Sequence, residues 1–194
     1  MSSVLTWKDI VAIKNITPQA RSEFVYLGAH NTADEPMPGV WSRAEDMSLS
    51  WPARSYDGRV GDFLAVSSPT NIQLADRLYG KVVALVQQGR HFTHLGIVRS
   101  KKSVQVTDPT EQYQHFVWVE ILAINPEGFQ VDVPGVAVNA LPFYNQGGHF
   151  TRIDRVSGLS PVQRAQLRQD IWLGFGPIAT PGPAITADRK AFRP

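Results

Sequence analysis

The chain of 194 residues contains no cysteine, which excludes disulfide bonds, thiol catalysis and cysteine-ligated metals. It also lacks a long apolar run at its start, because Lys8, Asp9 and Lys14 interrupt the apolar residues there. We therefore expect neither a signal peptide nor a membrane span. The expected location is the cytoplasm, and no membrane partner is expected.

Short motifs of several enzyme classes are missing as well. No glycine-rich loop of the Walker type opens a helix, and no Gly-x-Ser-x-Gly elbow is present. His91 and His94 are three residues apart, a spacing that points side chains to opposite faces of a strand and disfavours a shared metal. The sequence therefore predicts no metal and no cofactor, and it favours a protein that is not an enzyme.

The chain has little excess of charge of either sign, since its net charge is only +2. This weakly basic balance permits a nucleic-acid partner without requiring one. A hydrophobic content of 43% is enough for a sizeable core, and the length fits a single domain spanning residues 1–194.

The apolar pattern predicts an α+β fold in which short strands outnumber helices. Helices are expected after Thr6, where Asp9 favours the first turn, from Asn71 to residue 88, and over residues 160–173, where Ser160 and Gln163 form a capping box. Strands are expected over 24–28, 60–66, 93–98 and 115–124, with shorter candidates at 129–138 and 150–156. A tail rich in glycine and proline follows over 174–194.

Aromatic and basic residues in an irregular segment, residues 29–59, suggest a ligand site. A long loop in a small domain is often functional, and loop tryptophans are common material for stacking a planar ligand. Arginines beside such a loop suit phosphate contacts. Thr93 and His94 are polar residues in an apolar strand and can line a pocket. The candidate pocket residues are Asn31, Trp41, Ser42, Trp51, Thr93, His94 and Trp118, and the candidate phosphate contacts are Arg43, Arg54, Arg59, Lys101 and Lys102.

Taken in order, these segments resemble the PUA-like superfamily, especially its EVE and YTH branches. The matching pieces are the strand over 24–28, Gly39-Val40-Trp41-Ser42, the Gly61-Asp62 strand, Thr93-His94-Leu95 with the rest of its strand, and the strand over 117–121. The resemblance covers about residues 22–125. The Thr-His-Leu opening is also similar to domains found beside bacterial defence modules.

This resemblance implies a small β-barrel of about five or six strands, with its core over about 22–156, helices at both ends and one helix between strands. It implies a non-enzymatic module that recognises a base, modified in many such domains, in an aromatic pocket entered at Trp41-Ser42. Either Trp51 or Trp118 is the second aromatic of that pocket. The expected partner is DNA or RNA.

Two alternatives remain open at the level of sequence. One is a metal-dependent nuclease or hydrolase that uses Asp62, His94 and Glu120 as acid and base groups, although Asp62 also fits a simple turn. The other is a sensor that binds a small ligand or a protein through an exposed apolar patch.

Overall fold

The computed structural model of the chain describes residues 4–15, 19–21, 24–26, 54–56, 59–65, 73–74, 76–87, 91–99, 104–105, 115–145, 150–178 and 181. Its content is mixed α+β, as expected from the sequence. The strands are β1 Ile10–Asn15, β2 Gln19–Arg21, β3 Phe24–Tyr26, β4 Arg54–Tyr56, β5 Arg59–Ala65, β6 Val82–Gln87, β7 His91–Val98, β8 Val104–Gln105, β9 His115–Phe129 and β10 Phe150–Arg152. The helical elements are η1 Trp7–Asp9, η3 Val138–Ala140, α2 Pro142–Asn145, η4 Ile153–Arg155 and α3 Pro161–Phe175.

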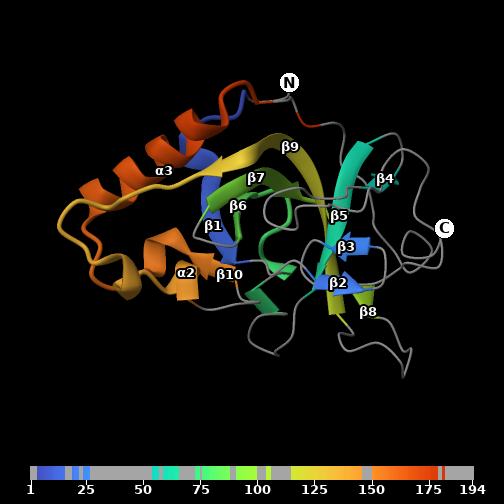
Figure 1. Cartoon of the computed structure of the whole chain (residues 1–194), viewed down its shortest axis with the longest axis horizontal. Coiled ribbons are helices and arrows are strands. Elements are labelled where there is room, and N and C mark those ends of the chain that lie inside the picture. The colour runs from blue at the N-terminus through green and yellow to red at the C-terminus, as the bar shows by residue number, and fades with distance from the viewer. Residues whose placement is uncertain are drawn as a thin grey trace.

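Eight of these strands form one sheet in the order β10-β1-β6-β7-β9-β5-β4, with β8 paired to β9 (Figure 1). The pair β1–β6 is parallel and the other neighbours are antiparallel. Strands β2 and β3 form a separate ribbon. Among the described strands, β10 and β4 are the two ends of the large sheet and no pairing joins them, so the expected barrel is not closed by these pairs.

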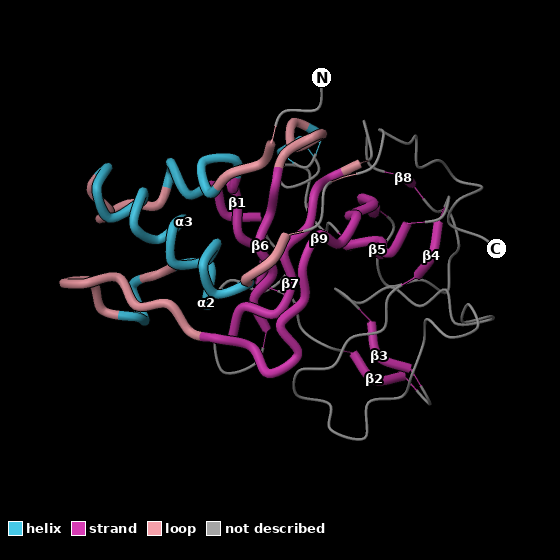
Figure 2. Tube along the Cα trace, turned by 90° about the horizontal axis from the view of Figure 1, so that it is seen from above, coloured by secondary structure: helices cyan, strands magenta, loops and turns pink. Residues whose placement is uncertain are grey.

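The sheet buries apolar side chains on both of its faces. On β6, Val82, Ala84 and Val86 belong to a core cluster shared with α3, while Val83 and Leu85 belong to a second cluster. We call the first side the helix face and the second side the opposite face. Helices α2 and α3 lie together on one side of β1, β6 and β7 (Figure 2). The sequence of β6 is therefore a continuous apolar run without alternation, which is usual for a strand that is covered on both faces.

That run explains one wrong prediction, the helix between strands over residues 71–88. Residues 73, 74 and 76 are helical, but Gly80 adopts a φ of +72° and the chain then enters β6. Apolar residues three and four apart in this segment also fit a short strand buried on both faces, and its three valines favour the strand. The helix has already ended before Gly80, whose left-handed conformation belongs to the turn that leads into β6.

The helix expected after Thr6 is also wrong beyond its first turn. The cap is present, because the Asp9 carboxylate accepts hydrogen bonds from the Thr6 backbone N–H at 2.7 Å and from its hydroxyl at 3.2 Å. It closes only the single turn η1, and the chain continues as strand β1. β1 lies between β6 and β10, so its pairing with two strands outweighs the local helix signal.

Helix α3 confirms the prediction for the end of the chain and extends it to Phe175. Ser160 accepts a hydrogen bond from the Gln163 backbone at 3.2 Å, and the Gln163 side chain accepts one from the Ser160 backbone at 2.8 Å. Its buried residues recur every four positions and therefore lie on one side of the helix, facing the sheet. These residues are Leu167, Ile171 and Phe175.

The last turn of α3 packs directly against an aromatic ring of β9. A Cβ atom built at Gly174 would overlap the ring of Phe129. That ring stacks on Phe92 at 5.6 Å and meets Phe175 edge-on at 4.9 Å between centroids, so it has little room to move. A glycine is therefore required inside this helix, although glycine weakens helices in general.

Gly174→Ala is expected to lower the free energy of unfolding by about 1–3 kcal/mol, because overpacking against a fixed ring outweighs the gain in helix propensity. Urea denaturation measures this change. Leu173→Ala, at a neighbouring side chain that is 75% exposed, is the control and should change stability by less than about 0.5 kcal/mol. A more stable Gly174→Ala variant would contradict the packing described for Phe129.

Candidate ligand-binding site

The polar pair Thr93 and His94 lies at a β-bulge of β7. Phe92 and His94 pair with consecutive residues of β6, which leaves Thr93 as the extra residue between them. Phe92 and Leu95 both belong to the cluster on the helix face. The bulge therefore turns Thr93 and His94 together toward the opposite face, where strict alternation would separate them.

The two side chains form a buried hydrogen-bonded unit. Thr93 Oγ1 and His94 Nδ1 are 2.9 Å apart, and neither residue has any exposed surface. Burial lowers the pKa of His94 to about 3, so the imidazole is neutral at physiological pH. A neutral imidazole offers one donor and one acceptor, which suits recognition by hydrogen bonds rather than attraction of charge.

A buried lysine lies in the same row of the sheet. Lys14 on β1 is in register with Leu85 on β6, and Leu85 is in register with His94 on β7. Residues in register share a face, and two strand spacings separate the Cα atoms of Lys14 and His94 by about 10 Å. The ammonium group of Lys14 lies 5.7 Å from the centroid of the Phe150 ring.

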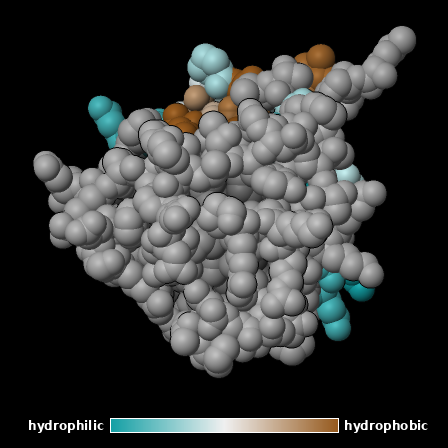
Figure 3. All heavy atoms as spheres, turned by 90° about the vertical axis from the view of Figure 1, so that its right-hand side faces the viewer, coloured by the Kyte–Doolittle hydropathy of each residue, from teal (hydrophilic) through white to brown (hydrophobic). Residues whose placement is uncertain are grey.

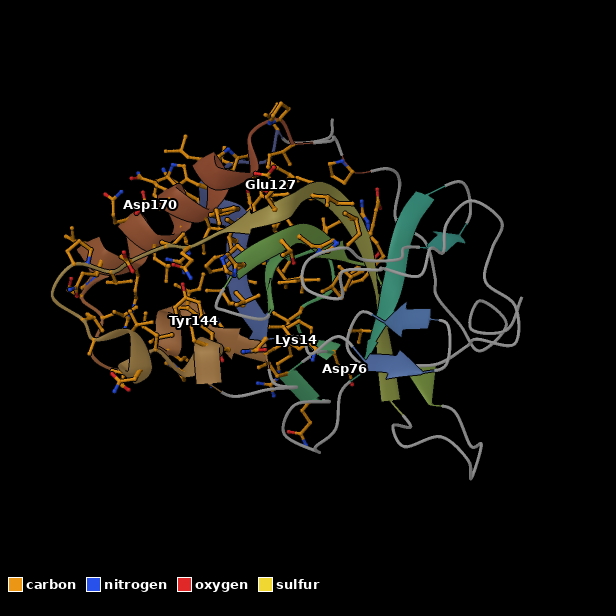
Figure 4. The ribbon with its side chains drawn as sticks, viewed as in Figure 1. Lys14, Asp76, Glu127, Tyr144 and Asp170 are labelled. Carbon is orange, nitrogen blue, oxygen red and sulfur yellow. The ribbon has the colours of Figure 1, made fainter. Side chains whose placement is uncertain are left out.

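Lys14 is only 1% exposed. Burial lowers the pKa of its ammonium group to about 7, because the charged form is poorly solvated in this interior. Figure 4 shows Lys14 within the body of the sheet, whereas Asp170 lies on the outer side of α3. The opposite face thus carries a row that combines a neutral histidine, a threonine hydroxyl and a lysine that titrates near neutrality.

An ion pair occupies the other side of the sheet. Arg99 follows β7 and its Nε donates to Glu120 Oε2 on β9 at 3.0 Å, with both side chains 8% exposed. Val119 and Ile121 flank Glu120 and belong to the cluster on the opposite face. By alternation, Glu120 points to the helix face, which makes it a buried structural partner of Arg99.

The three acid and base groups of the alternative enzyme hypothesis are thus not brought together among the described side chains. His94 points to the opposite face and Glu120 to the helix face. Asp62 pairs with Val119 in the sheet, and its side chain is outside the description. Within the described residues, no three histidine, aspartate or glutamate side chains gather closely enough to hold a metal ion.

The other residues predicted for the site are placed only in part. Arg54 lies on β4 opposite Gly61, Arg59 on β5 opposite Tyr56, and Trp118 on β9 opposite Phe63, while their side chains are outside the description. The remaining predicted residues lie outside the described residues: Asn31, Trp41, Ser42, Arg43, Trp51, Lys101 and Lys102.

Sequence reasoning missed Lys14 and the pairing of Arg99 with Glu120. From the sequence, Lys14 is identified only as a charge that interrupts the apolar residues near the start of the chain, although a lone lysine in the run Ile10–Asn15 also fits a buried strand with one ionisable group. Glu120 is likewise the single charge of an apolar strand, and such a residue needs a partner when it is buried.

No family model, no curated protein and no solved structure matches this chain. In the part of the chain that the structure describes, no helix has the length and apolar character needed to cross a membrane.

Lys14 is expected to make stability depend on pH. Between pH 7 and its ordinary pKa of 10.5, the unfolded chain holds a proton that the folded chain has lost, so stability rises as pH increases. In this window, the free energy of unfolding of the wild type should rise relative to that of Lys14→Met by an amount that approaches about 1.4 kcal/mol per pH unit. Chemical denaturation from pH 7 to pH 10 measures it.

Lys8→Met, at an exposed lysine of η1, is the matched control, because the same substitution there removes no buried ammonium group. A constant difference between the wild type and Lys14→Met over the same range would show that Lys14 is not buried as described.

Proposed function

We propose that this chain is a nucleic-acid-binding module without catalytic activity, which holds a base, in particular a modified base, in an enclosed pocket. A PUA-like barrel is part of this proposal. The described strand pairs run from β10 to β4 and no pair among them closes the barrel. The observation that carries the proposal is the buried, neutral Thr93–His94 pair at the bulge of β7.

A neutral donor and acceptor pair in a dry site suits the edge of a base. Hydrogen bonds are stronger away from water, and a ligand that leaves a buried polar group unpaired loses about 1–3 kcal/mol. Such a site rejects bases whose edges do not match Thr93 and His94. A charged imidazole would instead favour anions of many kinds, and the low pKa of His94 argues against that mode.

The remaining roles in the proposal come from the sequence. Trp41 stacks on one side of the base and Trp51 or Trp118 on the other, while Ser42 and Asn31 add hydrogen bonds. Stacking on an aromatic side chain contributes about 1–3 kcal/mol per base. The residues assigned to backbone phosphates are Arg43, Arg54, Arg59, Lys101 and Lys102.

The same geometry disfavours acid–base catalysis. A general base works best when its pKa lies near the operating pH, and burial holds the pKa of His94 at about 3. Glu120 is engaged by Arg99 on the other face of the sheet. A binding module therefore fits these residues better than a hydrolase does.

A binding screen tests the proposal directly. Full-length protein is titrated against labelled single- and double-stranded oligonucleotides, of DNA and RNA, with and without common base methylations. We expect one class to bind, with an affinity about tenfold weaker for Trp41→Ala. Thr93→Val should also weaken binding, because it removes the hydroxyl while keeping the shape of the side chain.

Trp7→Ala is the control, since this tryptophan lies on η1 outside the proposed pocket. Circular dichroism verifies that each variant is folded. If no oligonucleotide binds, or if the affinity is the same with Trp41→Ala and Thr93→Val, the proposal is wrong. Metal-dependent cleavage that is lost in Asp62→Asn would support the enzyme instead.

A further inference from the structure

A group of arginines gathers around one carboxylate where β10 and η4 meet α3. Arg152 ends β10, Arg155 ends η4, and Arg164 and Arg168 lie one turn apart on α3. The carboxylate of Asp154 interacts with Arg152, Arg155 and Arg168, and Arg164 interacts with Arg168. None of these five residues belongs to the pocket proposed above.

Arg152 holds the carboxylate in a two-point contact. Its Nε donates to Asp154 Oδ1 at 3.0 Å and a terminal nitrogen donates to Oδ2 at 2.7 Å. Partial burial acts to raise the pKa of Asp154, but the hydrogen bonds and charge of Arg152, with the charge of Arg155, outweigh it and lower that pKa. Asp154 is therefore ionised and already engaged, and Arg155 is exposed beside it.

The two arginines of α3 are anchored by neutral groups. Arg168 Nε donates to the Ile10 carbonyl at 2.8 Å, and Arg164 donates from a terminal nitrogen to the Val156 carbonyl at 3.0 Å. Carbonyl groups fix the direction of a guanidinium without cancelling its charge. The Nε atom of Arg164 is buried and has no hydrogen-bond acceptor among the residues that the structure describes.

The charges in this group do not balance. Burial lowers the pKa of Arg168, the charge of Asp154 raises it, and the charge of Arg164 lowers it again. Two other carboxylates on η1 and α3 bond elsewhere, Asp9 to Thr6 and Asp170 to Gln166. Asp154 thus interacts with Arg152, Arg155 and Arg168, and Arg168 also lies beside the charge of Arg164, in a chain whose total net charge is only +2.

We propose that Arg152, Arg155, Arg164 and Arg168 form a surface that binds the phosphodiester backbone of a nucleic acid, independently of its bases. The planar guanidinium group matches phosphate oxygens in pairs, and carbonyl anchors hold two of the four groups in place before binding. A concentration of positive charge on a nearly neutral chain suits a ligand that repeats its negative charge along its length. We call this group the arginine surface.

The test uses an oligonucleotide that has phosphates and sugars but no bases. Full-length protein is titrated with a labelled abasic single strand at several salt concentrations. Each phosphate contact on a single strand changes log K by about 0.7 for each tenfold change in salt, so one contact contributes about fivefold to the affinity at 0.1 M salt relative to 1 M. Arg155→Gln, which removes one such contact, should therefore bind about fivefold more weakly at 0.1 M salt. The slope of log K against log salt should fall by about the same 0.7.

Two variants make the result specific to the arginine surface. Asp154→Asn removes the carboxylate that interacts with three of these arginines and should bind the abasic strand several-fold more tightly. Arg77→Gln, at an exposed arginine outside the surface, should bind like the wild type. Thr93→Val should also bind the abasic strand like the wild type, so failure here and failure of the base pocket are distinguishable.

The proposal is overturned if the abasic strand does not bind, or if Arg155→Gln and Asp154→Asn leave its affinity and salt slope unchanged. It is also overturned if inorganic polyphosphate binds tightly while the abasic strand does not, since the surface would then recognise a different polyanion.

Discussion

The fold depends on the pairing of β9 along both of its edges. Its first part pairs with β5 and its second part with β7, so one strand joins the two halves of the sheet. Gly96 allows this pairing, because a Cβ atom there would overlap Val119 and lie 3.0 Å from the Glu120 carbonyl oxygen. The ion pair of Glu120 with Arg99 lies at the same point. Figure 3 shows apolar residues along the upper edge of the molecule in that view.

A single irregularity in this regular frame brings the Thr93–His94 pair together. The bulge in β7 leaves Thr93 without a paired residue on β6, and it places Thr93 and His94 on one face of the sheet. His94 is in register with Leu85, which is in register with Lys14. Burial then determines their chemistry, because it keeps the histidine neutral and brings the lysine close to neutrality. The two proposed sites therefore differ in kind, since the Thr93–His94 pair would offer neutral hydrogen bonds and the arginine surface would offer fixed charge.

The sequence predicted the elements whose signals are local. The capping box of Ser160 with Gln163 located α3, and continuous apolar runs located β5, β7 and β9. It failed for β1 and β6, because a strand buried on both faces has no alternation and resembles a short helix. It named Thr93 and His94 as pocket residues, yet the bulge that unites them comes from pairing between strands and leaves no pattern in the sequence. Lys14 was missed because it is buried as part of β1, a segment for which the sequence predicted a helix.

The most direct test of the account is nuclear magnetic resonance of the His94 ring in protein labelled with nitrogen-15 at histidine. In the free protein, the ring nitrogens should report a neutral imidazole from pH 8 down to about pH 4, since burial holds the pKa near 3. A base-bearing oligonucleotide that binds should shift the His94 signals, and an abasic strand should not. Titration of His94 near its ordinary pKa of 6.5, or signals that no bound base disturbs, would contradict the account.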